Sequence, residues 1–134
     1  MNNELYYSTP EDVINATGVE HKDFKHIETE EELKAMIEGW LVEIKDFIDQ
    51  DRNRDYHLED KIPKGIHSIA RRACINMVIY AIQSQRSPVI RIGDWSIRMV
   101  EERVFTPSLL ADLHKFPAKP LFRIYRIEGE TISE

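Results

Sequence analysis

The longest regular pattern of hydrophobic residues in this chain runs from Leu33 to Ile48. Its apolar side chains recur at steps of three and four residues, which places them along one side of a helix of about five turns. They are Leu33, Met36, Ile37, Trp40, Leu41, Ile44, Phe47 and Ile48. Thr29 and Glu32 precede this run with the spacing of a capping box, so the helix is predicted to begin there. Acidic residues occupy its outer side.

Two shorter helices are predicted from capping signals. Thr9 before Pro10, followed by Gly18, predicts a short helix from Pro10 to Thr17, because Thr caps a helix start, Pro fits its first turn and Gly ends it. Thr106-Pro107-Ser108 predicts a third main helix that ends before Pro117.

A second long helix is predicted to open at Ile62-Pro63 and to end at Ser87-Pro88. Its apolar face is broad enough to predict a central position in the fold. The residues of that face are Ile66, Ile69, Ala70, Ala73, Met77, Ile79, Tyr80 and Ile82.

Beyond this helix the apolar period shortens toward two, which is typical of strands. Val89 to Met99, with a turn at Gly93-Asp94, predicts a small β-hairpin that packs on the helices or pairs with another chain. Pro117 and Pro120 then favour an extended path. The chain is thus predicted to be mainly α, with three main helices, a short N-terminal helix and the hairpin in a helical domain of residues 1–116, and an extended C-terminal arm of residues 117–134. This arm either covers the domain's own sheet edge or docks on a partner.

Composition narrows the class of protein. A chain of 134 residues fits one domain, its single Cys74 permits no internal disulfide, and no apolar run is long enough to cross a membrane. The net charge of −6 is divided along the chain. Residues 1–60 hold six Lys/Arg against seventeen Asp/Glu (−11), residues 61–127 hold twelve against four (+8), and the last seven hold three Glu (−3). Either the molecule has an acidic and a basic side, or the two halves neutralise each other.

Signals for chemistry are few. The sequence holds no nucleophile-elbow or phosphate-loop motif, so neither enzymatic activity nor a cofactor is expected. Cys74 is predicted to be a buried apolar residue, and the five histidines are predicted to lie on the surface. Asp49 to Asp60 has the register of a calcium loop, but Arg54 stands where that loop needs Gly, so a solvated loop without metal is expected. A pI of about 5.4 argues against a stand-alone DNA-binding domain.

The order of parts resembles a known family. The phrases that carry the likeness are Tyr7 to Val13, the acidic helix, Arg54-Asp55-Tyr56, Ile62-Pro63, Ala70-Arg71-Arg72-Ala73, Ser87 to Trp95 and Val104-Phe105-Thr106. Over residues 6–116 this arrangement is similar to the head-tail connector (head-completion, or adaptor) proteins of tailed bacteriophages. The resemblance implies a non-enzymatic virion protein, made in the host bacterial cytoplasm, that forms a homo-oligomeric ring, typically a dodecamer, under the portal vertex.

In that family the ring binds the portal protein on one side and a stopper or tail-completion protein on the other, and packaged DNA passes through it without sequence-specific binding. We therefore expect no membrane contact, and partner-interface residues on the hairpin and the arm. These candidates are Trp95, Ile97, Met99, Phe122, Ile124 and Tyr125. An acidic channel lining would repel DNA, and its candidates are Glu30, Glu31 and Glu38. The alternative is a small helical regulatory or nucleic-acid-associated protein.

Overall fold

The fold is mainly helical, as predicted. The computed structural model describes residues 7–24, 27–56, 62–84 and 103–116. Its elements are α1 (Pro10–Thr17), the short 3-10 helix η1 (His21–Asp23), α2 (Glu30–Arg52), α3 (Lys64–Ser84) and α5 (Pro107–Leu113). The predicted hairpin and C-terminal arm lie outside the described residues, so both stay predictions.

Local signals place α1 where the sequence predicted it. The Thr9 hydroxyl accepts a hydrogen bond from the Asp12 backbone N–H at 3.1 Å, and Pro10 occupies the first turn. Gly18 ends the helix with φ of 70°, a left-handed conformation that costs glycine little. Val13 is the fully buried contact of this helix with the core.

Both ends of α2 depart in detail from the prediction. Thr29 caps the helix by accepting the Glu32 N–H, but the Glu32 carboxylate accepts from the N–H of Glu28 and not from that of Thr29, so the capping box is half formed. The solvated loop expected over Asp49 to Asp60 is wrong for its first four residues, because the helix continues to Arg52. Asn53 then ends it with φ of 54°, and its N–H donates to the Asp49 carbonyl. Residues 57–60 of the expected loop lie outside the described part of the chain.

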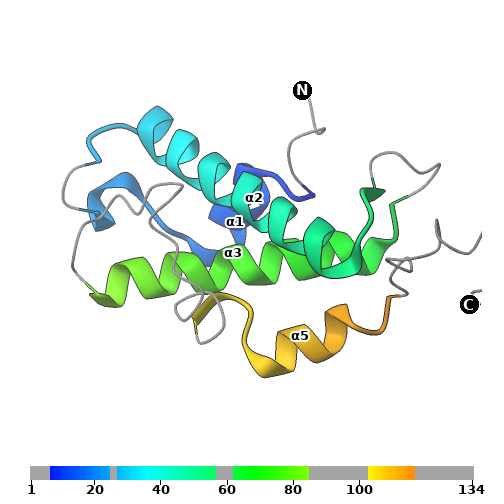
Figure 1. Ribbon diagram of the computed structural model, residues 1–134. Helices are drawn as coiled ribbons and strands as arrows, with labels where there is room; N and C mark the ends of the chain where they lie inside the picture. The colour runs from blue at the N-terminus through cyan, green and yellow to red at the C-terminus, as the bar shows by residue number, and fades with distance from the viewer. Residues whose placement is uncertain (1–6, 25–26, 57–61, 85–102, 117–134) are drawn as a thin grey trace, which may run out of the picture.

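The central position predicted for α3 is confirmed, since this helix contacts α1, α2 and α5 (Figure 1). Pro63 lies one residue before the helix, and its carbonyl accepts the Ile66 N–H. The broad apolar face was wrong at one position, because Ile79 points away from the core and is 46% exposed. The core side of α3 consists of Ile66, Ile69, Ala70, Ala73, Cys74, Met77, Val78 and Ala81.

The helix predicted after Thr106 is present as α5 but has only seven residues, so the prediction of three main helices is not confirmed. Thr106 caps α5 by accepting the Leu109 N–H, and Leu109 and Leu113 are buried. Just before it, Phe105 stacks on Phe47 of α2 with ring centroids 4.1 Å apart. Beyond its end, the Phe116 ring lies against Gly65 in the first turn of α3. A short helix is thus held by contacts to both long helices.

Candidate functional site

The structure describes the predicted channel residues but not the predicted interface residues. Trp95, Ile97, Met99, Phe122, Ile124 and Tyr125 lie outside the described residues, so their roles stay predictions. Glu30, Glu31 and Glu38 all lie on α2 and are exposed. The structure does not, however, bring these three carboxylates together.

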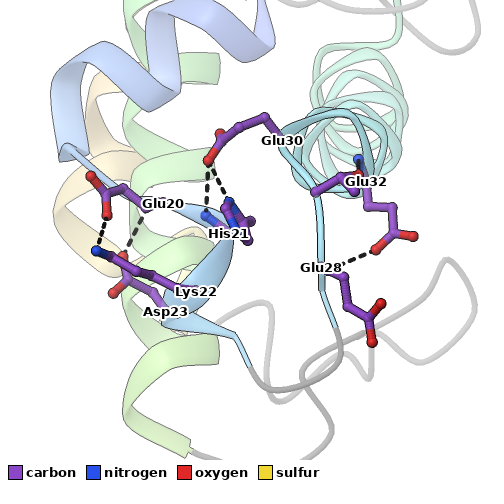
Figure 2. Close-up of polar contacts among 8 residues, drawn as sticks. Glu20, His21, Lys22, Asp23, Glu28, Glu30 and Glu32 are labelled. Atoms are coloured by element: carbon purple, nitrogen blue, oxygen red, sulfur yellow. Dashed lines mark hydrogen bonds and ion pairs between the residues drawn. The ribbon is translucent and has the colours of Figure 1, made fainter.

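The Glu30 carboxylate already has hydrogen-bond partners within the chain. Its Oε2 lies 2.7 Å from Nδ1 of His21 and accepts the His21 backbone N–H at 3.3 Å (Figure 2). The hydrogen bond from the His21 side chain, followed by the one from its backbone, lowers the pKa of Glu30 below its usual value. This carboxylate therefore joins η1 to the start of α2.

Other acids at this end of the molecule also bind nearby backbone or side chains. The Asp23 carboxylate accepts the Glu20 N–H at 2.9 Å, and the Glu20 carboxylate pairs with Lys22 at 3.2 Å (Figure 2). Glu32 accepts the Glu28 N–H in the same way. These acids stabilise the chain between α1 and α2, and such a local role explains their number without a ligand.

Glu31 and Glu38 lie seven residues apart on α2 and therefore share one face of the helix, which does not include Glu30. With Ala35 and Val42 they form a row at steps of four, three and four residues, here called the α2 stripe. The first three residues are exposed and Val42 is half-buried. Among the described residues, no basic side chain pairs with either carboxylate.

The outer face of α3 carries a comparable row of the opposite charge. Lys64, Ser68, Arg71, Ile75 and Ile79 recur at steps of four, three, four and four residues, here called the α3 stripe. Lys64, Arg71 and Ile79 are exposed, and Ser68 and Ile75 are half-buried. Within the described ranges no carboxylate contacts Lys64 or Arg71, and α3 itself contains no Asp or Glu.

The two charged halves do not neutralise each other in the described part of the chain. Arg72 and Lys115 both pair with Asp112, at 2.9 and 3.3 Å, so these cations are matched within residues 62–116. Several acids of residues 7–56 bind lysines and arginines of that same segment, as in Lys34 with Glu11 and Lys45 with Asp49. One histidine, His114, reaches across to Asp51. The ion pairs of the described residues thus form mainly within each half of the chain.

A buried polar cluster joins the N-terminal segment to the end of α2. Lys45 is 8% exposed, and its Nζ lies 2.6 Å from Asp49 and 3.2 Å from Asp55. The Tyr7 hydroxyl donates to Asp49 at 2.5 Å and accepts the Tyr56 backbone N–H at 2.9 Å. Two segments more than 40 residues apart in the sequence therefore meet at one phenol.

The charge states of this cluster follow from its surroundings. Burial, then the hydrogen bond to Asp49, raises the pKa of Tyr7, so the phenol stays a donor. Burial alone would lower the pKa of Lys45, but the hydrogen bonds and charges of Asp49 and Asp55 outweigh it and raise that pKa. The sequence prediction missed this cluster. Its signal is a lysine inside the apolar stripe of a helix, four residues before an aspartate.

No group of three or more metal-ligating side chains occurs among the described residues. In the first half of the calcium register, Asp49 binds Tyr7 and Lys45, and Asp51 binds Arg52 and His114. Burial raises the pKa of the Cys74 thiol, which agrees with its predicted role as an apolar residue. No described helix combines the length and hydrophobicity needed to cross a bilayer.

Comparisons with known proteins add no further assignment. No protein-family model, curated protein or solved structure matches this chain. The function must therefore be argued from the surfaces described above.

Proposed function

We propose that this chain is a structural subunit of the head-tail connector of a tailed bacteriophage, where copies form a ring under the portal and extend the DNA channel. The observation that carries the proposal is the separation of charge: an exposed acidic row on α2 and an exposed basic row on α3 that find no partner among the described residues. Closed rings need two different surfaces on each copy that match one another. The order of elements that resembles connector proteins supports the same role.

The hairpin and the arm complete the proposal. Trp95, Ile97 and Met99 would contact a neighbouring copy or the portal, and Phe122, Ile124 and Tyr125 would anchor the arm on the portal or on a stopper or tail protein. Two uses of the α2 stripe are compatible with a ring, since its carboxylates can line the channel or contact the next copy. Glu30 is the weakest of the channel candidates because His21 already holds it.

Electron microscopy of this protein mixed with capsids that carry their portal tests the proposal. The expected result is additional ring-shaped density at the portal vertex, with copies arranged around the channel axis. Capsids without a portal serve as the control and should gain no density. A protein that leaves portal-bearing capsids unchanged at saturating concentration would contradict the proposal.

A second candidate function rests on the cations of the α3 stripe. Lys64 and Arg71 are exposed and unopposed among the described residues, which would suit contact with phosphates in a nucleic-acid-associated protein. Tight binding of the isolated chain to duplex DNA, weakening steeply with salt, would favour this function over the connector.

A further inference from the structure

The carbonyl of Phe116, the last described residue before the predicted C-terminal arm, is bound by a side chain from the end of α2. Nη1 of Arg52 donates to this carbonyl at 2.9 Å, across 64 positions of the sequence. We infer that Arg52 sets the direction in which the arm, residues 117–134, leaves the helical domain, and that this direction presents the arm to the portal. The inference rests on the proposed function, in which the arm attaches each copy to its partner.

Phe116 is fixed at three of its groups. Its backbone N–H donates to the Leu113 carbonyl of α5 at 3.0 Å, and its ring lies against Gly65 of α3. Its carbonyl accepts from Arg52 of α2. These contacts come from three different helices, so Phe116 cannot turn without losing a contact with at least one of them.

Arg52 is itself held in place. Its Nε donates to Oδ2 of Asp51 at 3.1 Å, and the same oxygen lies 3.0 Å from Nε2 of His114. The side chain of Arg52 is 14% exposed, so its neighbours leave it little rotamer freedom. The planar guanidinium therefore offers Nη1 to the Phe116 carbonyl in one orientation.

A bound carbonyl fixes more of the chain than one atom. Because a peptide group is planar, the orientation of the Phe116 carbonyl also sets the plane of the bond to Pro117. The ring of Pro117 then locks φ at about −65°. Lys119 precedes Pro120, and a residue before proline favours an extended backbone. The sequence thus predicts that a direction set at Phe116 persists through the first residues of the arm.

A fixed exit suits the attachment of a ring. Rotational symmetry repeats the exit at the same place on every copy, so arms that share one direction can meet equivalent sites on the portal together. An arm that left in many directions would lose more conformational entropy on binding, which weakens each contact. Because the contact between Arg52 and Phe116 lies within one copy, it is compatible with any rotation between neighbouring copies.

Arg52→Met tests the inference, because it keeps a long unbranched side chain and removes the guanidinium donors. Its matched control is Arg72→Met, which removes the same charge and an ion pair with Asp112 of α5 at 2.9 Å, and leaves the bond between Arg52 and Phe116 in place. Circular dichroism should show unchanged helix content in both variants. Pro117→Gly is a second variant, which leaves the described domain unaltered and frees φ at the first residue of the arm.

The direction of the arm is measured on the isolated chain by double electron–electron resonance between spin labels at Glu38→Cys and Ala118→Cys. Glu38 is exposed and lies on α2, fourteen residues or about 21 Å before Arg52. Cys74 is buried and stays unlabelled. Arg72→Met should give the distance distribution of the wild type, whereas Arg52→Met and Pro117→Gly should each give one about twice as wide.

Attachment is measured by co-sedimentation with portal-bearing capsids. Arg52→Met and Pro117→Gly should bind about tenfold more weakly than the wild type, and Arg72→Met should bind as the wild type does. Equal losses in the two arginine variants would overturn the inference, because that result is expected if Arg52 only stabilises the fold.

The two measurements separate the inference from the proposed function. Wide distance distributions together with weak attachment support the inference. An unchanged distribution in Arg52→Met overturns it, and so does a wide distribution with full attachment. If Arg52→Met does not fold, Pro117→Gly decides by the same two results. A wild type that does not bind the capsids refutes the connector function, and the distances then still decide whether Arg52 directs the arm.

Discussion

The Tyr7 side chain joins the N-terminal segment to the end of α2 and the residues that follow it. Its hydroxyl donates to Asp49 and accepts the Tyr56 N–H. Tyr7→Phe keeps the ring but removes both bonds, and leaves a buried backbone donor without this acceptor. We expect the free energy of unfolding to fall by about 1–3 kcal/mol, measured by urea denaturation.

The matched control for this variant is Tyr80→Phe. Tyr80 is half-buried, and the Arg103 guanidinium lies over the face of its ring. The Cζ atom of Arg103 is 5.3 Å from the ring centroid. Because that contact survives the loss of the hydroxyl, the control should change stability by less than about 0.5 kcal/mol. Equal losses in the two variants would refute the special role of the Tyr7 hydroxyl.

The Glu30 carboxylate makes the stability of the fold depend on pH in the acidic range. The pKa of its carboxyl in the folded protein lies below the usual 4.5, so the stability that it contributes is present above that value and is lost as pH falls through the folded pKa. Glu30→Gln should therefore melt at a lower temperature than the wild type at pH 6. The difference should shrink as pH falls below 4.5. Thermal melts across this range check it.

Glu31→Gln is the control for the pH effect, since Glu31 is the adjacent exposed residue and binds no cation among the described residues. Its melting curve should run parallel to that of the wild type at every pH. A wild-type advantage over Glu30→Gln that persists undiminished at pH 3 would show that the His21 contact does not depend on the charge of Glu30.

At the scale of the helices, the sequence predicted the first residues of helices better than the last residue of α2. Thr9, Thr29 and Thr106 each cap a helix as predicted, because a cap depends on residues within one turn. The end of α2 could not be predicted in this way. Its last turn is polar in sequence, and it stays helical where Asp49 is held by Lys45 and by Tyr7, which lies 42 residues away.

The same distinction applies to the candidate site. Sequence reasoning found the acidic side of α2 but grouped Glu30 with Glu31 and Glu38, since all three read as exposed acids. The separation depends on His21, which an irregular turn places beside Glu30. The exposure of Ile79 was missed for a similar reason, because apolar residues surround most of α3 and periodicity alone does not show which side faces the core.

The docking of α5 on α3 can be tested through one glycine. A Cβ at Gly65 would overlap the tip of the Phe116 ring. Gly65→Ala should therefore lower the free energy of unfolding by about 1–2 kcal/mol through overpacking. In a Phe116→Ala background the same change should raise it by up to about 1 kcal/mol, because alanine favours a helix more than glycine does. Denaturant unfolding of the four proteins measures both effects, and the same sign in both backgrounds would refute the contact.

At the scale of the whole molecule, the core stabilises the fold, and the charged rows on α2 and α3 take no part in that core. The buried cluster draws its residues from Tyr7 to Leu113 and includes the contacts of all four α-helices. The unopposed charges of α2 and α3 contribute nothing to that cluster and cost self-repulsion in an isolated chain. This arrangement suits a protein whose stability is supplied within each copy and whose specificity is supplied between copies.

The predicted C-terminal arm, residues 117–134, can be tested by deletion. The buried residues of the described core come from Tyr7 to Leu113, so we expect the helices to fold without the arm. Deletion of residues 117–134 should then leave helix content unchanged and shift the melting temperature little. If the arm anchors each copy on the portal, the same deletion should abolish co-sedimentation with portal-bearing capsids. A truncated chain that binds such capsids as well as the full chain would assign attachment to the helical domain. A truncated chain that unfolds would instead show that the arm covers its own domain, the other role that the sequence left open.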